Sequence, residues 1–233
     1  MPTPLTPDQL QALGYLSTCS VANAIETFET RLRNEGFCGR GVRAVFPQQK
    51  PVVGYAATVK IRCSSPPPEG HNYLEHTDWW SEIQKQPGPR IVVIEDVDSQ
   101  FGLGALVGEV HANILKSLGC VGVVTNGAVR DLPALEAIGF AAFASRIAVS
   151  HAYAHIVELG TPVEIAGLKI ESGDLLHGDC HGVISIPAKI AAEVPAVAVR
   201  MMARDKEVIS LCKPDGNVED LRSAIRKFRS APV

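Results

Sequence analysis

Apolar side chains near the start of the chain recur at helical spacing. Val21, Ile25 and Phe28 lie three or four positions apart, which predicts a helix over residues 17–33. Before this segment, Thr6 can cap a helix and Pro7 stands at its first position. We therefore expect two helices between residues 6 and 36.

The middle of the chain alternates short apolar runs with segments of helical period. Residues 91–94, Ile-Val-Val-Ile, are typical of a strand buried on both faces. The following pattern predicts a helix over 105–118 with Gly119 as its C-cap, a strand over 121–125, a turn at Asn126-Gly127, a helix over 132–138 and a strand over 141–147. This βαβαβ order predicts a parallel sheet with right-handed crossovers.

Short segments separated by glycine fill the last third. They predict hairpin strands at 163–165, 168–170, 175–176 and 183–186, then a helix opened by Pro187 and a helix over 194–206. Earlier segments predict a strand over 54–61, an irregular loop over 64–70 and a helix over 72–84. The expected fold class is α/β: a central βαβ sheet with flanking helices and a C-terminal region of short hairpin strands, in a single domain over residues 1–233.

Composition narrows the class of protein. With 233 residues, 46% of them hydrophobic, the chain can build a sizeable core. Its net charge of −3 argues against a nucleic-acid or membrane-surface binder, because such proteins usually carry a basic excess. No apolar stretch approaches the roughly 20 residues that span a bilayer. The first ten residues lack the basic flank and apolar run of a secretory signal, so we expect a cytoplasmic protein.

Cysteine and histidine spacing gives weaker signals. No two cysteines form a CxxC pair, so we expect reduced core thiols; they are Cys19, Cys38, Cys63, Cys120, Cys180 and Cys212. The string His177-x-Asp179-x-His181 can share one face of a strand as metal ligands do, but a structural role is the stronger interpretation. His151 and His155 lie four apart on a predicted helix, and we expect surface positions.

Candidate chemistry gathers between residues 102 and 131. Arg130 and Asp131 directly follow a predicted buried strand, and the carboxyl ends of such strands are where ligands bind in open α/β sheets. Asp131 can give Mg²⁺ a hard oxygen ligand, and Arg130 can grip a carboxylate with its fork of donors. Glu109, after glycines that include Gly102, Gly104 and Gly108, can act as a general acid or base.

Each of these residues also has a plainer interpretation. An Arg-Asp pair after a strand is often an ion pair at a helix start, and Glu109 alone would more often be a solvated helix residue. The glycines from Gly102 to Gly108 suggest nucleotide binding as well, but they lack the G-x-G-x-x-G spacing and no acidic partner for a ribose is evident. His76, Trp79 and Trp80 either line the entrance to a site or pack at an interface, and we favour packing.

Taken as a set, these residues resemble a known family, the one that includes 4-hydroxy-4-methyl-2-oxoglutarate aldolase and the regulator of ribonuclease activity A (RraA-like). The resemblance covers about residues 50 to 190 and rests most firmly on the blocks Gly108-Glu109, Gly122-Val123-Val124, Gly127 and Val129-Arg130-Asp131, with weaker blocks at Gly173-Asp174-Leu175-Leu176 and Gly54 to Val59. Asn23, where the family often has Asp, His111 and the loop 64–80 depart from the pattern.

The resemblance implies roles for individual residues. Asp131 would ligate a divalent metal, Mg²⁺ or Mn²⁺, and Arg130 would bind substrate. Backbone amides at Gly108, Glu109, Val110 and His111 would hold the carboxylate of a 2-oxo acid, and Glu109 would handle a water molecule on the metal. Family members form trimers or hexamers with interfacial sites, to which a C-terminal glutamate of a neighbour can contribute; Glu207 is the nearest candidate.

The function that follows is a metal-dependent lyase. It would cleave 4-hydroxy-2-oxo dicarboxylates to pyruvate, with oxaloacetate decarboxylation as a side activity, because both reactions leave the same enolate. The rival is a non-catalytic regulator that binds and inhibits a ribonuclease. The set of Glu109, Arg130 and Asp131 disfavours the rival, since a pure binder does not need that chemistry.

Overall fold

The computed structural model describes residues 3–67, 76–212 and 217–230. The helices of these residues are α1 (Pro7–Gly14), α2 (Thr18–Glu26), α3 (His76–Gln84), α4 (Glu109–Ser117), α5 (Leu132–Ala137), α6 (Val194–Ser210) and α7 (Val218–Ser230). The strands are β1 (Arg43–Ala44), β2 (Val52–Arg62), β3 (Arg90–Asp96), β4 (Cys120–Val129), β5 (Ala141–Ile147), β6 (His155–Leu159), β7 (Val163–Ile165), β8 (Leu168–Ile170), β9 (Leu175–Asp179) and β10 (Gly182–Ile186).

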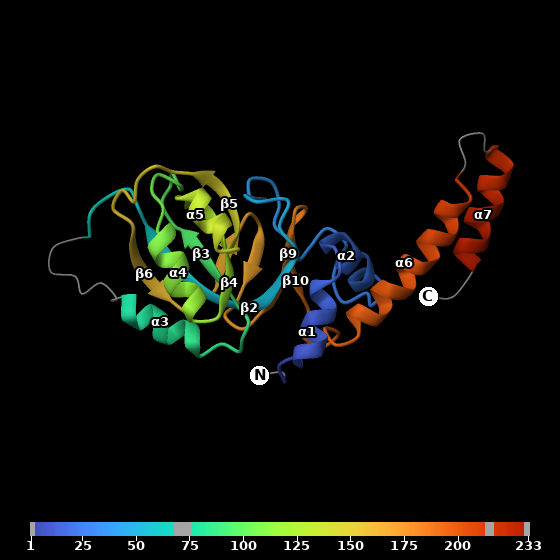
Figure 1. Cartoon of the computed structure of the whole chain (residues 1–233), viewed down its shortest axis with the longest axis horizontal. Helices are drawn as coiled ribbons and strands as arrows, with labels where there is room; N and C mark the ends of the chain where they lie inside the picture. Colours follow the sequence, from blue (N-terminus) through green and yellow to red (C-terminus); the bar gives the residue numbers. More distant parts are fainter. Residues whose placement is uncertain (1–2, 68–75, 213–216, 231–233) are drawn as a thin grey trace.

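A mixed eight-stranded sheet organises the molecule (Figure 1). Its order is β1-β5-β4-β3-β2-β9-β10, with β6 also paired to β2. Strands β2, β3, β4 and β5 are parallel neighbours, and the other pairs are antiparallel. The fold is therefore α/β with a parallel centre, and the predicted hairpins are present as β7–β8 and β9–β10.

The run 91–94 divides between the two faces of the sheet. Val92 and Ile94 pack into the cluster that holds side chains of α3, α4 and α5, whereas Ile91 and Val93 pack into the cluster beneath the β7–β8 hairpin. Because side chains alternate along a strand, an unbroken apolar run fills both cores. A third cluster joins α1, α2 and α6 to the β9–β10 side of the sheet.

Several predicted elements are confirmed at their predicted places. Thr6 caps α1 with a capping box and Pro7 begins it. Strand β5 spans residues 141–147 as expected, and α5 agrees to within one residue. The described part of the predicted helix 72–84 is α3, while residues 68–75 lie outside the described ranges.

Three predicted helices have different limits. The helix expected over 17–33 ends at Glu26, and Glu29 then takes a positive φ of 51° that no right-handed helix accommodates. The helix expected from 105 begins at Glu109. Pro187 is followed by turns and not by a helix, and α6 begins at Val194. Pro195 lies in the first turn of α6, where a backbone N–H would have no partner in the helix, so its absence removes no hydrogen bond.

The predicted turn at Asn126-Gly127 is wrong, because β4 continues through both residues to Val129. The register with β5 shifts between Thr125 and Ala128, so the extra residues form an irregularity within the strand. On the other side of β4, the Asn126 side chain continues the contact with β3: its Oδ1 accepts from the amide of Asp96 at 2.7 Å, and its Nδ2 donates to the Asp96 carbonyl at 2.9 Å.

Helices α6 and α7 project from the sheet as an arm at the opposite end from α4 and α5 (Figure 1). The helix α7 was not predicted from the sequence. The arm carries strongly exposed apolar side chains, among them Val199, Ile209, Leu211, Val218 and Ile225. Among the described helices, none has both the length and the apolar character needed to traverse a bilayer.

Candidate active site at the end of strand β4

Asp131 lies where β4 ends and α5 begins. Its backbone is left-handed, with φ 56° and ψ 42°, so the chain turns sharply between Arg130 and Leu132. Aspartate is among the few residues with a side chain that tolerate this conformation. The turn leaves the carboxylate 35% exposed and beside the guanidinium of its neighbour.

The segment before α4 docks against this strand end. Val107 forms a parallel bridge with Val129, and the amide of Arg130 donates to the Val107 carbonyl at 3.1 Å. Gly108 is the N-cap of α4, so this docking brings the start of the helix directly against Arg130 and Asp131. Residues that are more than twenty positions apart in the sequence thereby form one cluster.

The carboxylate of Asp131 is held by two donors. The backbone amide of Glu109 donates to Oδ2 at 3.0 Å, and Arg130 Nε donates to Oδ1 at 3.3 Å. The amide of Glu109 is the largest influence on the pKa of Asp131, which it lowers, and the hydrogen bond and charge of Arg130 and the charge of His151 lower it further. Asp131 is therefore ionised at neutral pH.

Gly108 has to lack a side chain in this arrangement. A Cβ at this position would lie 2.4 Å from Asp131 Oδ2 and 2.9 Å from Arg130 Cγ. Its backbone is extended, with φ −134°, so the glycine serves close approach and not an unusual dihedral angle.

The positive end of α4 adds backbone donors. The first hydrogen bond across its N-terminus runs from the Ala112 amide to the Gly108 carbonyl at 2.9 Å, so the amides of Glu109, Val110 and His111 precede the acceptors of the helix. Glu109 and Val110 are exposed and His111 is half-buried. Amides at a helix start favour an anion such as a carboxylate.

The predicted residues Gly108, Glu109, Arg130 and Asp131 thus meet in one place, formed by the end of a parallel strand and the start of the neighbouring helix. A family model described as RraA-like (Aldolase/RraA) matches residues 18–185, which include this cluster. The chain belongs to the RraA-like family.

Two relatives by sequence resemble this RraA-like chain. An uncharacterised protein of Methanocaldococcus jannaschii is 26% identical over 201 residues, which cover 85% of this chain and 87% of the relative. A protein of Halalkalibacterium halodurans named "Putative 4-hydroxy-4-methyl-2-oxoglutarate aldolase" is 32% identical over 125 residues, covering 53% of this chain and 58% of that protein.

Solved structures share the fold of the RraA-like chain. An uncharacterised protein of Pseudomonas syringae pv. tomato has a TM-score of 0.74 at 21% identity and covers 96% of both chains. Streptomyces coelicolor RraAS2, described as an unusual member of the RNase ES inhibitor RraA family, has a TM-score of 0.69 at 19% identity, covering 88% of this chain and 96% of that one. The family thus includes both aldolases and ribonuclease inhibitors.

The glycines at 102 and 104 have another role than the one expected. Gly102 donates its amide to Asp96 Oδ2 at 2.8 Å, and a Cβ on Gly104 would meet the His151 carbonyl oxygen at 2.1 Å. Both glycines therefore allow close contact with other segments of the RraA-like chain and not with a ligand at a helix start. The helix expected from residue 105 begins only at Glu109.

Two acidic residues that the sequence analysis did not single out hold this loop. Asp96 accepts the amides of Gly102 and Asp98, while Asp98 accepts the amides of Cys63 and Ser64 at 2.7 and 2.8 Å. The available signal was their position directly after the buried run of β3, at the same sheet edge as Asp131.

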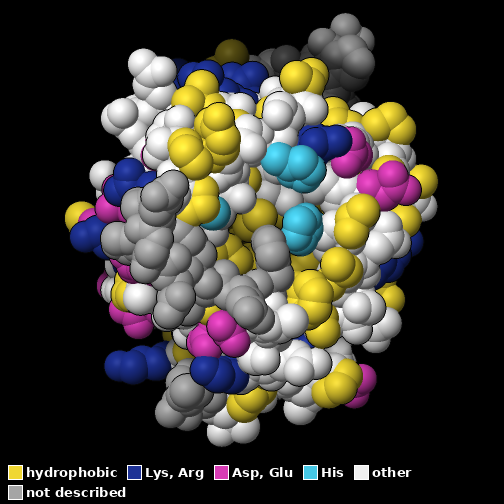
Figure 2. All heavy atoms as spheres, turned by 90° about the vertical axis from the view of Figure 1, so that its left-hand side faces the viewer, with side chains coloured by type: hydrophobic (Ala, Val, Ile, Leu, Met, Phe, Trp, Pro, Cys, Tyr) yellow, Lys and Arg dark blue, Asp and Glu magenta, His cyan; other side chains and the backbone are white. Residues whose placement is uncertain are grey.

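His151 was also missed as a neighbour of the site. The predicted helix that would carry it is absent: His151 lies in a turn and His155 begins β6. Its Nδ1 lies 3.0 Å from the Ala105 carbonyl oxygen, close enough to Asp131 for its charge to affect that pKa. Figure 2 shows histidine side chains gathered on the end of the molecule formed by α3, α4 and β6.

Two further residues that the sequence singled out, Trp79 and His177, are buried in the protein core. Trp79 is fully buried, with its ring 6.2 Å from that of His111, so it packs inside the chain and not at an interface as expected. His177 is buried between Thr18 Oγ1 at 2.9 Å and the Leu13 carbonyl at 3.2 Å, away from His181 in the following turn. A cavity of about 930 Å³ lies elsewhere, lined by residues that include Tyr55, Lys85 and Asp174.

The cysteines agree only in part with the prediction. All six lie in described segments and carry free thiols. Cys63 and Cys120 are buried and Cys38 is partly buried, but Cys19, Cys180 and Cys212 are exposed. Those three are not core thiols.

Proposed function

We propose that this chain is a divalent-metal-dependent carbon–carbon lyase that cleaves 4-hydroxy-2-oxo dicarboxylates to pyruvate and decarboxylates oxaloacetate. The observation that carries the proposal is the meeting of Asp131, Arg130 and the start of α4. An ionised carboxylate, a guanidinium and a row of helix-start amides lie within one cluster. These are the groups that a 2-oxo acid and a metal would require together.

The residues present fit Mg²⁺ or Mn²⁺. Asp131 offers oxygen ligands, is held ionised and is 35% exposed, and Glu109 places a second carboxylate at the same helix start. A three-ligand protein cage does not occur at this place within the described residues. Mg²⁺ does not need one, because it commonly takes one or two carboxylates and completes its shell with water and substrate. When bound, the metal would polarise the keto oxygen of the substrate.

Each residue of the cluster then has a defined task. The amides of Val110 and His111 bind the substrate carboxylate, which the positive end of α4 favours, while the amide of Glu109 holds Asp131. Arg130 orients the 2-oxo group and stabilises the negative charge of the enolate that remains when the bond breaks. The Glu109 carboxylate transfers the proton between substrate and water.

The site is exposed in a single chain, which supports completion by a neighbouring subunit in a homotrimer or hexamer. Glu207 lies on α6, at the opposite end of the molecule from α4 and α5 (Figure 1), so it can contribute only to the site of another copy. The exposed apolar side chains of the arm are suited to such an assembly.

The test is pyruvate release from oxaloacetate and from 4-hydroxy-4-methyl-2-oxoglutarate. Wild type and Asp131→Ala are assayed with Mg²⁺, with Mn²⁺ and with EDTA, alongside Asp78→Ala, which removes an exposed carboxylate from α3. We expect metal-dependent turnover in wild type and Asp78→Ala, and a loss of at least about 100-fold in Asp131→Ala.

Turnover that survives EDTA, or that persists in Asp131→Ala, would contradict the proposal. Absence of turnover with both substrates would instead favour the rival role of a ribonuclease regulator. A pull-down of purified ribonuclease with this chain then tests that role directly.

A further inference from the structure

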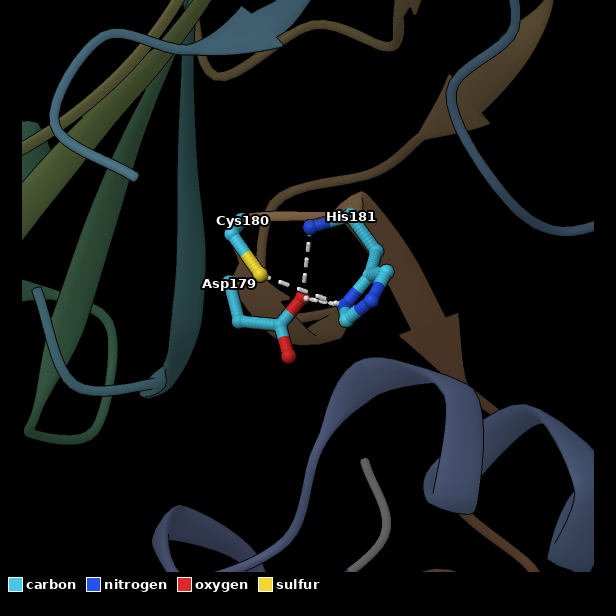
Figure 3. A group of neighbouring side chains, drawn as sticks. All are labelled: Asp179, Cys180 and His181. Atoms are coloured by element: carbon cyan, nitrogen blue, oxygen red, sulfur yellow. Dashed lines mark hydrogen bonds and ion pairs between the residues drawn. The ribbon is translucent and has the colours of Figure 1, made fainter. Parts of the chain in front are cut away.

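A second group of potential metal ligands lies on the turn between β9 and β10, apart from the cluster at Asp131. Asp179 is the last residue of β9, and Cys180 and His181 form the turn before Gly182 begins β10. One oxygen, one sulfur and one nitrogen of these side chains all lie within 4.8 Å of one another (Figure 3). Asp179 is buried, whereas Cys180 and His181 are exposed.

The spacing of these atoms is that of a tetrahedral site. Zinc bonds of about 2.3 Å to sulfur and about 2.0 to 2.1 Å to nitrogen and oxygen place sulfur about 3.6 Å from nitrogen, and nitrogen about 3.3 Å from oxygen. Cys180 Sγ lies 3.4 Å from His181 Nδ1, which lies 3.0 Å from Asp179 Oδ1. Only small side-chain shifts separate this group from coordination.

The donor types select the metal. Thiolate and imidazole favour a borderline-soft ion such as Zn²⁺, whereas Mg²⁺ takes oxygen ligands almost exclusively. Burial by itself would raise the pKa of Asp179, but hydrogen bonds from the amides and side chains of Thr18 and His181 outweigh it and hold that pKa below its ordinary value. The carboxylate is therefore ionised and ready to bind a cation.

A fourth donor stands on α2. Asp179 Oδ2 accepts the amide of Thr18 at 2.9 Å, so the first turn of α2 lies against the β9–β10 turn, and the next residue is the exposed Cys19. The Cys19 sulfur does not belong to the group whose atoms all lie within 4.8 Å of one another, so its side chain has to move toward the turn to reach a metal held there.

We propose that Asp179, Cys180 and His181 form a zinc site, with Cys19 as the fourth ligand, independent of the proposed lyase site. On binding, the thiols of Cys180 and Cys19 release their protons to solvent, and His181 carries its remaining proton on Nε2 so that Nδ1 can coordinate. The metal would tie α2 to the β9–β10 hairpin. Without the metal, Asp179 is the one side chain of these four that links the two elements, through its bond from the Thr18 amide.

The experiment uses Co²⁺ as a spectroscopic substitute and Zn²⁺ as its competitor, with the full chain kept reduced. Cobalt bound to thiolate gives a ligand-to-metal charge-transfer band that oxygen ligands do not give. Titrations compare wild type with Cys180→Ser, His181→Ala and Cys19→Ser. The matched control is Cys212→Ser, which removes an exposed thiol at the end of α6, and Asp131→Ala separates this site from the lyase site.

We expect wild type, Cys212→Ser and Asp131→Ala to bind one equivalent of Co²⁺ with the band, and Zn²⁺ to displace it. Cys180→Ser and Cys19→Ser each leave one thiolate in the site, so each should give a weaker band than wild type. Zn²⁺ binding should weaken at least about 100-fold in Cys180→Ser and at least about 10-fold in His181→Ala and Cys19→Ser, since even residues behind the ligands commonly cost 10- to 100-fold. Wild type without a saturable band, or an undiminished band in Cys180→Ser, would overturn the site. Unchanged affinity in Cys19→Ser would remove Cys19 from it.

Discussion

The backbone amide of Glu109 donates to Asp131 Oδ2 at 3.0 Å, across the junction between the start of α4 and the end of β4. This bond is the first cause of the lowered pKa of Asp131. It also makes the position of the carboxylate depend on where the helix begins. The charge and the geometry of the candidate site are therefore set by the same contact.

Gly108→Ala should disable the site while leaving the fold intact. The added methyl group would lie 2.4 Å from Asp131 Oδ2, so the carboxylate has to move, and a displacement of about 1 Å can cost about 100-fold in rate. We expect kcat/KM for oxaloacetate to fall by about that factor, with the free energy of unfolding changed by less than about 1 kcal/mol. The matched control is Gly14→Ala at the end of α1, where a Cβ meets nothing within 4 Å. Equal activities in the two variants would disprove the steric argument.

Arg130→Lys tests the guanidinium as distinct from the positive charge. Lysine keeps the charge but lacks the planar fork that bonds Asp131 through Nε while facing a substrate. Loss of one charge-assisted hydrogen bond costs about 1.5–3 kcal/mol, so kcat/KM should fall about 10- to 100-fold. Steady-state kinetics on oxaloacetate measure it, and wild-type kinetics in the lysine variant would show that charge alone suffices.

His177 should make stability depend on pH in the mildly acidic range. Burial is the main cause that lowers its pKa below the ordinary 6.5, so the folded chain keeps it neutral while the unfolded chain takes up a proton. Its contribution to stability is thus complete above about pH 6.5 and decreases as pH falls below that value. Urea unfolding at pH 7.5, 6.5 and 5.5 should show a steeper decline for wild type than for His177→Gln. Parallel declines would assign the pH dependence to other groups.

Ile209 should contribute to an interface between copies of the chain. Its side chain is 65% exposed on α6, within the projecting arm. Ile209→Glu would place a charge in an apolar contact, so light scattering should report a smaller assembly than for wild type. Arg200→Glu, at an exposed position nine residues earlier and so on the opposite face of the same helix, is the control and should keep the wild-type mass. A monomeric wild type would contradict the proposed trimer or hexamer.

Much of the fold was predictable because it rests on local patterns. A few neighbouring residues are enough to predict the apolar strand β3, the helix cap at Thr6 and the hairpins separated by glycine. The first and last residues of the helices were harder to predict from the sequence. Whether residues 105–108 extend α4 or pair with β4 is decided by the bridge from Val107 to Val129, which no local pattern reveals.

The candidate site was found through residue types, but its geometry was not. The sequence singled out Arg130 with Asp131 and Gly108 with Glu109, and the fold brings these residues together. The left-handed backbone of Asp131 and the proximity of His151 depend on tertiary contacts between distant segments. For the same reason the sequence could not bring the first turn of α2 against the β9–β10 turn, since that contact depends on the hydrogen bond between Thr18 and Asp179.

The sheet has a consequence for how the chain is made. Strand β2 lies between β3, which follows it closely in the sequence, and β9, with Val53 opposite His177. During synthesis on a ribosome, the part of the β2 edge that pairs with β9 and not with β6, residues 52–55, therefore stays without its partner until β9 has emerged. Pairing between such distant segments is intrinsically slow, and an unpaired edge invites association with other nascent chains. Folding of this protein in the cell should be completed late, with a need for protection until β9 arrives.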